Sequence, residues 1–254
     1  MMKCLTMKNS LFLLMAASLA VISAHATNYY VDPASGNMTN SGTSGSPWST
    51  LEAVFTSGKT FSSGDVIYLR DGYHGVPTVA GNNGGDVTIQ AQSGHSPELA
   101  KITFNNASKW IVSGLSISRD HGSSSGELVV VNSNSSYITM DSCDVAFTFS
   151  ISGWTTSNML NNLGEAVKIR GSNTTFTNNY VLNSAFGIVV TETSSNSTIS
   201  YNVVEGIRED GMRILGNYCI VEYNTIMDFY GVDSAHDDGI QSWAVNGTVY
   251  GVEL

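Results

Sequence analysis

The sequence has 254 residues and a formal net charge of −10, with 42% hydrophobic and 13% charged residues. Disordered chains combine low hydrophobicity with high net charge, so this composition indicates a packed core. Nucleic-acid binding needs clustered Lys and Arg, and with 11 basic against 21 acidic residues we expect no nucleic-acid partner. Abundant Gly, Asn, Ser and Thr disfavour long helices and predict an all-β protein with many turns.

Residues 1–26 have the order of a secretory signal peptide. Lys3 and Lys8 precede an apolar run over 11–22, and Ala24-His25-Ala26 provides the small residues of a cleavage site. The apolar run has about a dozen residues, whereas a membrane-spanning helix needs roughly 20. We therefore expect cleavage after Ala26 and a soluble protein, extracellular or periplasmic, that has no membrane anchor.

Residues 27–109 are predicted to form an N-terminal cap and the first strands. Ser49 and Thr50 precede an acidic and apolar run over 51–54, which is typical of a short capped helix. The segment 64–72 is typical of a turn, a strand and a second turn. A helix placed here would cover the open end of a repetitive fold, where unpaired strand edges invite aggregation.

An internal repeat follows. The segments 175–181, 198–204 and 220–226 align without gaps around an asparagine, and the spacings between the asparagines are 23 and 22 residues. Those asparagines, which we expect to form a hydrogen-bonded ladder at a turn, are Asn179, Asn202 and Asn224, with Cys143 at the same place in 140–145. The aligned apolar positions are Phe176, Ile199 and Val221 in one column and Val181, Val204 and Ile226 in another.

A second strand recurs over 165–169, 186–190, 210–214 and 238–242. Its third and fifth positions are mostly apolar, so the fourth position should face outward. Repeats of 20–25 residues with short strands and Gly/Asn turns predict a right-handed parallel β-helix over 110–254 that forms one domain with the cap. A β-sandwich would show hairpins every 8–12 residues, and a leucine-rich repeat would show many more leucines.

The predicted register separates the two cysteines that follow the leader, Cys143 and Cys219, by about three rungs. Rungs are roughly 4.8 Å apart, and a disulfide needs Cα atoms within about 7 Å, so we expect two free, buried thiols. The segment 247–254 reads as a new strand without an asparagine turn after it. We therefore expect the sequence to be incomplete at its C-terminus.

The chain resembles the secreted β-helix polysaccharide lyases, particularly the chondroitinase B and alginate lyase family and related pectate lyase types. The segments that carry the resemblance are 30–32, 47–51, 64–69, 71–73, 87–89 and 110–115. The resemblance implies the fold and a role in carbohydrate chemistry. That family carries two nearby glutamates for Ca²⁺, then a lysine and an arginine. Here Glu165, Lys168 and Arg213 occur, but with one glutamate at a different spacing, so the active-site motif is not matched.

The repeat register brings four acidic residues together, because it places Glu209 and Asp210 beneath Asp237 and Asp238. Four close carboxylates repel unless a cation intervenes, and Ca²⁺ prefers oxygen ligands. These residues are therefore candidate Ca²⁺ ligands. The alternative is that an Asp before a Gly only forms the turn through local backbone bonds. Beside them stack Gly187, Gly211 and Gly239, interpreted as a strip without side chains that a flat polymer can approach.

Three further residues are candidates for catalysis. Uronate β-elimination needs a group that neutralises the carboxylate, a base and an acid. Lys168 is the candidate base and Arg213 the candidate carboxylate clamp, although both should face outward, and solvated surface charge is the default interpretation of such residues. His236, predicted above Arg208, is a candidate acid or base, and a plain surface histidine is its alternative.

The sequence leads to one main hypothesis and two alternatives. The main one is an exported, monomeric lyase that cleaves an acidic, uronate-containing polysaccharide by β-elimination, with Ca²⁺ as a candidate cofactor. The first alternative is an inverting glycoside hydrolase that uses Asp210 with Asp237 or Asp238, about 6.5–9.5 Å apart. The second is a glycan-binding or adhesin β-helix without catalysis. Trp154 and Trp243 are candidate sugar-stacking residues in all three.

Overall fold

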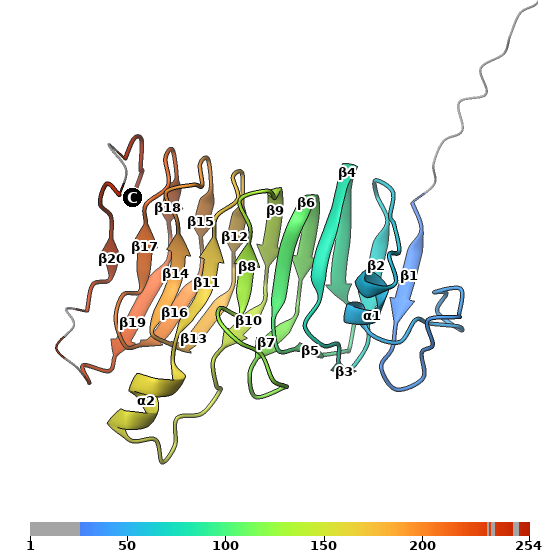
Figure 1. Cartoon of the computed structure of the whole chain (residues 1–254), viewed down its shortest axis with the longest axis horizontal. Helices are drawn as coiled ribbons and strands as arrows, with labels where there is room; N and C mark the ends of the chain where they lie inside the picture. Colours follow the sequence, from blue (N-terminus) through green and yellow to red (C-terminus); the bar gives the residue numbers. More distant parts are fainter. Residues whose placement is uncertain (1–25, 233, 235–236, 246–248) are drawn as a thin grey trace, which may run out of the picture.

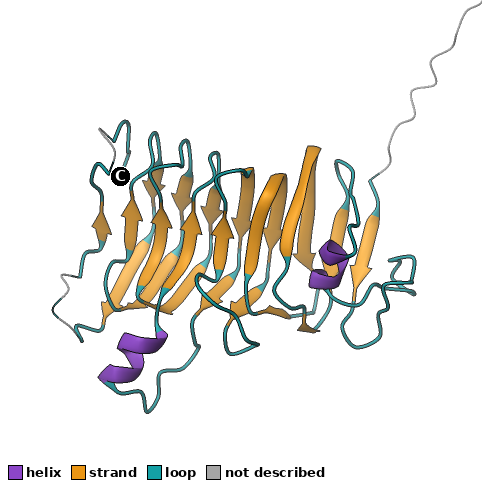
Figure 2. Ribbon diagram, in the orientation of Figure 1, coloured by secondary structure: helices purple, strands orange, loops and turns teal. Residues whose placement is uncertain are grey.

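The computed structural model describes residues 26–232, 234, 237–245 and 249–254. It is an all-β solenoid of parallel strands stacked rung on rung (Figure 1), and the ribbon coloured by secondary structure shows how small the helical part is (Figure 2). The predicted parallel β-helix is thus confirmed. In the described part of the chain, no helix has the length and apolar character needed to cross a membrane.

Each rung contributes strands to three stacks. The first stack contains β8 (Val129–Val131), β11 (Glu165–Ile169), β14 (Phe186–Val190), β17 (Met212–Ile214) and β20 (Ile240–Gln241). The second contains β9 (Ser136–Asp141), β12 (Thr175–Thr177), β15 (Thr198–Ser200) and β18 (Ile220–Glu222). The third contains β3 (Gly72–Tyr73), β5 (Pro97–Leu99), β7 (Ser116–Ser118), β10 (Asp144–Ala146), β13 (Tyr180–Ser184), β16 (Val203–Ile207) and β19 (Thr225–Phe229). We call these the first, second and third faces.

The stacking begins at the N-terminal side of the predicted boundary at residue 110. Strands β1 (Asn28–Val31), β2 (Val66–Leu69), β4 (Thr78–Ala91) and β6 (Ile102–Ser113) pair in parallel, in that order. The long β6 then pairs with both β8 and β9, so the first and second faces belong to one sheet. The early rungs lack the asparagine turn, and the β4–β6 ladder contains register shifts. For this reason the asparagine repeat, which predicts the later rungs, does not predict these early ones.

Two helices lie outside the stacked strands (Figure 1). The predicted capped helix is α1 (Leu51–Thr56), whose first turn is capped because the Thr50 hydroxyl accepts a hydrogen bond from the Ala53 N–H. The sequence did not predict α2 (Thr156–Asn162), which begins with a capping box between Thr155 and Asn158 and buries no residue. Without an apolar stripe, α2 has no periodic pattern from which it could be predicted.

Inward side chains form the continuous core that the repeat predicts. Phe176 pairs with Ile199, and Ile199 with Val221, in the registers of β12, β15 and β18. These three side chains are at most 3% exposed. Both thiols are also free and buried, as predicted, and burial raises the pKa of Cys143 to about 12. Cys143 therefore stays a neutral, unreactive thiol.

The glycine strip predicted from the sequence is wrong at Gly187 and Gly211, whereas a Cβ at the exposed Gly239 would meet nothing within 4 Å. A Cβ at Gly187 would lie 2.5 Å from a methyl carbon of Val204, and a Cβ at Gly211 would lie 2.4 Å from one of Ile226. Both glycines are buried, so their missing side chains make room for core residues rather than for a polymer on the outer surface. Alternation of two faces along a strand did not reveal this, because a glycine has no side chain to assign to a face.

Asparagine side chains join the rungs at the turn between the second and third faces. The side-chain oxygen Oδ1 of Asn202 accepts hydrogen bonds from the backbone N–H of Asn179 at 3.0 Å and from the side-chain amide of Asn179 at 3.1 Å. The Asn202 amide donates to the Phe176 carbonyl at 2.8 Å and to Asn224 at 2.9 Å. One rung earlier, Asn179 accepts from the Cys143 N–H. The predicted ladder is confirmed, and it satisfies backbone groups that have no other partner in the buried turn.

We predict that Asn202→Ala destabilises the protein by about 3 kcal/mol, because it removes the acceptor of the buried Asn179 N–H, one of the two acceptors of the Asn179 side-chain amide and the donor to the Phe176 carbonyl. Urea unfolding measures the change. The matched control is Asn82→Ala, since Asn82 is exposed on β4, and it should change stability by less than about 0.5 kcal/mol. Equal effects of the two substitutions would contradict a structural role for the ladder.

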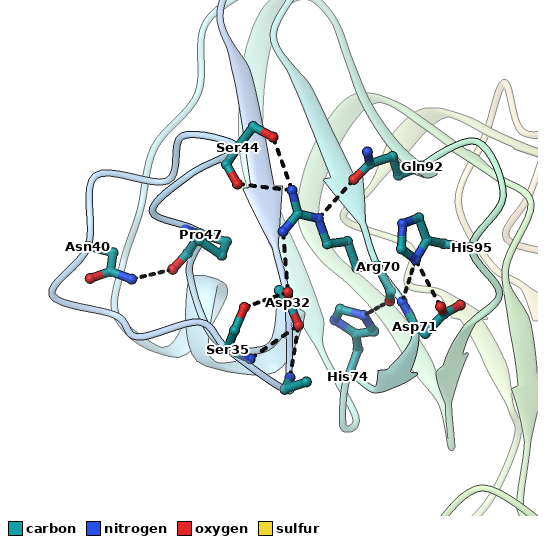
Figure 3. A network of polar contacts seen from close by, with 11 residues as sticks. Asp32, Ser35, Asn40, Ser44, Pro47, Arg70, Asp71, His74, Gln92 and His95 are labelled. Carbon is teal, nitrogen blue, oxygen red and sulfur yellow. Dashed lines mark hydrogen bonds and ion pairs between the residues drawn. The ribbon is translucent and has the colours of Figure 1, made fainter.

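A polar network fastens the N-terminal cap to the first rungs (Figure 3). The Arg70 guanidinium donates to Gln92 at 2.9 Å and forms an ion pair with Asp32 at 3.3 Å. His74 is fully buried, its Nδ1 accepts from the Leu51 N–H at 3.3 Å, and its Nε2 lies 2.8 Å from the Arg70 carbonyl. Burial lowers the pKa of His74 below its ordinary value of 6.5. The neutral imidazole thus joins α1 to the first rungs.

We predict that acid weakens this junction. The unfolded chain takes up a proton at His74 near pH 6.5, but the folded chain does so only at lower pH. The stabilisation that depends on neutral His74 is therefore fully present above about pH 6.5 and decreases as the pH falls below that value. Between pH 7.5 and 5.5, the wild type should lose up to about 1.4 kcal/mol more than His74→Gln, which keeps one donor and one acceptor but does not titrate. Parallel urea titrations at the two pH values test this; identical losses would refute it.

Candidate functional site

Two adjoining hollows, of about 390 and 400 Å³, lie along the first face and share Glu165 and Lys168. The first is lined by Arg119, Gly126, Glu127, Phe147, Asn161, Asn162, Leu163, Gly164, Glu165 and Lys168. The second is lined by Glu165, Lys168, Arg170, Val189, Thr191, Glu192, Thr193, Arg213, Leu215 and Trp243. We call the two together the basic groove. It runs from the loops before β8 and β11 across β11, β14 and β17.

The basic groove reverses the charge balance of the chain. Its basic residues are Arg119, Lys168, Arg170 and Arg213. Its acidic residues are Glu127, Glu165 and Glu192. The full sequence, by contrast, has 11 basic and 21 acidic residues. Basic residues therefore outnumber acidic ones by four to three in the lining of the two hollows, a local balance that suits an anionic ligand better than the chain as a whole does.

The strand register places two of the predicted catalytic residues in this groove. Lys168 pairs with Val189, Val189 with Arg213, and Arg213 with Gln241 along the first face. All four occupy the fourth position of the repeated strand. The prediction that Lys168 and Arg213 share an outward column is confirmed, with one rung between them. Neither is surrounded only by solvent, because each contacts charged neighbours.

Ion pairs occupy the centre of the groove. Lys168 Nζ lies 2.6 Å from Glu165 Oε2 and 3.7 Å from Glu127 Oε1. Arg170 Nη2 contacts the same Glu127 oxygen at 3.0 Å. Burial alone would raise the pKa of Glu127, but its own backbone N–H, Arg170 and Lys168 together hold that pKa below the ordinary value. Glu127 is thus a carboxylate that orients both cations.

Aromatic rings support the cations at the two ends. The Arg119 guanidinium lies 4.4 Å from the Phe147 ring centroid, and burial lowers the pKa of Arg119. At the other end, Arg213 lies 3.8 Å from the Phe186 centroid and 5.5 Å from that of Trp243. Flat rings fix the direction of a guanidinium without neutralising its charge. Trp243 is 41% exposed and lines the groove, so one of the two predicted stacking residues lies at the site; Trp154 packs against the core.

The four predicted calcium ligands have partners of their own. Asp210 is 1% exposed; its Oδ2 accepts from Arg213 at 2.5 Å and its Oδ1 from the Asp238 N–H at 3.3 Å. Glu209 forms an ion pair with Arg208 at 2.5 Å. Asp238 accepts a hydrogen bond from the Gln241 side chain at 2.9 Å. This pair has the same spacing of three residues as Asp210 and Arg213. These partners are side chains three residues along and a backbone N–H one rung away, whereas the turn interpretation of the two Asp-Gly pairs requires local backbone partners.

Asp237 and His236 complete the predicted cluster. In the described part of the chain, the buried Asp237 Oδ1 has no hydrogen-bond partner, and no group of three or more His, Cys, Asp or Glu side chains could hold a metal ion. His236 lies outside the described residues. Three of the four acidic residues have intramolecular partners, so no step is assigned to Ca²⁺.

No family model and no curated protein matches the chain. Solved structures with a similar fold include pectate lyase Pel9A, at 16% identity and a TM-score of 0.50 over 84% of this chain and 57% of that one. An alginate lyase from Paenibacillus sp. str. FPU-7 has 13% identity and a TM-score of 0.47 over 80% of this chain and 96% of that one. A rhamnogalacturonan lyase has 16% identity and a TM-score of 0.46 over 85% and 66%.

At these identities the similarity is one of fold. The Pel9A similarity confirms the parallel β-helix architecture expected from the sequence. The chain spans somewhat more than half of the length of pectate lyase Pel9A. The substrate of this protein has to be argued from its own groove.

We predict that Ca²⁺ does not stabilise the protein through the four acidic residues, since three of them already have intramolecular partners. Thermal unfolding in millimolar Ca²⁺ and in EDTA should give the same Tm. A ligand that binds only the folded state raises stability by about 2.7 kcal/mol at a hundred times its Kd. A Tm increase of that size, present in the wild type and absent in Asp238→Asn, would restore the calcium site.

Proposed function

We propose that the protein binds an acidic, uronate-containing polysaccharide in the basic groove and cleaves it by β-elimination. The observation that carries the proposal is the row of four cations that line two adjoining open hollows along the outer face of a β-helix. The hollow is long rather than closed, which suits a polymer. Arginine forks match carboxylates in two parallel hydrogen bonds. The proposed location is extracellular or periplasmic, as the leader predicts.

The cations at the groove's ends bind the uronate carboxylates. Arg213 is held by Asp210 through Nε, which leaves its terminal nitrogens for a ligand. Neutralising the carboxylate makes the hydrogen on the adjacent C5 more acidic, because the carbanion-like charge of the transition state spreads into that carboxyl group. Arg119 and Arg170 offer positions for further carboxylates along the same polymer.

Lys168 is the proposed proton-transfer residue, since it lies where the two hollows meet. Glu165, 2.6 Å from Nζ, orients the lysine. In its amine form Lys168 removes the C5 proton, the electrons of the C5–H bond form the C4–C5 double bond, and the C4–O bond breaks with its electrons on the leaving oxygen. The Lys168 ammonium produced by this proton transfer then protonates that oxygen and becomes the amine again. Water is not consumed, which separates elimination from hydrolysis.

A glycan-binding function without cleavage is the second candidate. It is favoured by the pairing of Lys168 with two carboxylates, which suits a binding cation as well as a base. The hydrolase alternative has less support. Both oxygens of Asp210 are engaged, and its side chain is buried, so it is not positioned to protonate a glycosidic oxygen or to activate water.

We predict that the purified protein, incubated with polyuronates, releases products that absorb in the near ultraviolet, because only elimination forms a conjugated double bond. Lys168→Met should lower kcat by about 10²–10⁴-fold, the usual contribution of a general acid–base group. Arg213→Gln should lower kcat and raise KM, because Arg213 binds the carboxylate and stabilises the charge that develops on it in the transition state. The control Lys59→Met, a lysine of the cap beside Trp48, should keep full activity.

Three outcomes separate the candidates. Ultraviolet-absorbing products that disappear in Lys168→Met support the lyase. Polymer binding that weakens in Arg213→Gln, with no product from any polyuronate, would leave the binding function. Shortened chains without ultraviolet absorbance, lost in Asp238→Asn, would instead establish a hydrolase.

A further inference from the structure

Outside the basic groove, a serine hydroxyl, an imidazole and a carboxylate lie in contact. Ser116 Oγ lies 2.7 Å from His121 Nε2, and His121 Nδ1 lies 3.5 Å from Glu98 Oε2. From this geometry we propose a second active site that hydrolyses small acyl esters on sugar hydroxyls, with Ser116 as nucleophile. The basic groove contains none of these residues, so this proposal stands apart from β-elimination.

The solenoid holds the three groups by two independent means. Glu98 on β5 and Ser116 on β7 are register partners on the third face, so their side chains point outward one rung apart. His121 lies on the loop that follows β7, where its N–H donates to the Ser118 carbonyl. That turn brings the imidazole back over the strand. The imidazole contacts the hydroxyl through one nitrogen and the carboxylate through the other, as acyl transfer by serine requires.

The site is open enough for a substrate but partly sheltered. The His121 side chain is 15% exposed and that of Glu98 44%. The Phe149 ring lies 5.6 Å from the His121 ring. Tyr73, the register partner of Glu98, packs its ring against Gly122, where a Cβ would come within 2.5 Å of the Tyr73 oxygen. Exposed aromatic rings thus flank the catalytic histidine.

These surroundings indicate the class of substrate. Tyr73 and Phe149 are 38% and 40% exposed, and such rings stack on sugars. The nucleophile lies on an outer face rather than in a deep cavity, which favours a short acyl group on an extended chain over a long lipid chain. The loop that carries His121 also supplies Arg119 and Gly126 to the basic groove.

The reaction proceeds in two balanced halves. Ser116 Oγ attacks the ester carbonyl while its proton passes to His121 Nε2, and the sugar hydroxyl leaves with that proton, which gives an acyl-serine. Water then attacks the acyl carbon, passes a proton to Nε2 and releases the carboxylic acid as Ser116 regains its hydrogen. The Glu98 carboxylate faces His121 Nδ1 and stabilises the imidazolium that forms in each half.

Covalent labelling tests the assignment on the full chain. A fluorophosphonate probe should modify the wild type once, and peptide mass mapping should place the label on Ser116. Ser116→Ala should abolish labelling, while the control Ser152→Ala, at an exposed loop serine, should keep it. Hydrolysis of 4-nitrophenyl acetate should fall by at least about 100-fold in His121→Gln and by about tenfold in Glu98→Gln.

Two comparisons keep the result interpretable. Ser116→Ala removes one hydroxyl from a partly exposed position, so an unchanged Tm shows that lost labelling is not lost folding. Lys168→Met should keep labelling, and Ser116→Ala should keep any elimination activity. The proposal is overturned if the wild type labels no more than Ser116→Ala, or if both hydrolyse the ester at the same rate. The three residues would then only tie the loop to the strand.

Discussion

The buried backbone at the turn between the second and third faces constrains the rest of the structure. Residues such as Tyr201, with a φ of 56°, turn the chain in the left-handed region, and the N–H that follows is met by the asparagine of the next rung. A one-residue slip would break this contact and send every inward side chain outward. The ladder therefore fixes the register, and the register alone puts Lys168 and Arg213 in one column.

The cations of the basic groove are oriented by neighbouring side chains rather than by solvent alone. Glu127 orients two cations at once, and rings of Phe147 and Phe186 orient two guanidinium groups. The arrangement lowers the rearrangement required when a ligand arrives. Partial exposure of these ion pairs means that they contribute little to folding stability, which leaves their geometry available for binding.

Sequence reasoning was most informative where the chain repeats. The asparagine frame gave the rung register and the outward place of Lys168 and Arg213. It gave neither Glu127 nor Arg119, which lie in a loop of irregular length with no period. The frame also made Asp210 and Asp238 candidate metal ligands, because the register shows that these acids are close together. It does not show that Arg213 and Gln241, three residues further along, are their hydrogen-bond partners. Ser116, His121 and Glu98 were missed because a loop conformation, not a spacing, joins them.

The close approach at Gly187 and Gly211 has a consequence for cooperativity. In a stacked fold each rung contacts only its two neighbours, so the free energy of unfolding is approximately a sum of interface terms along one dimension. At these glycines the interface between rungs includes backbone that no side chain separates. Unfolding that separates one end of the stack from the other at this point would have to disrupt this interface. The groove spans the same rungs, so its shape should persist even while distant rungs fluctuate.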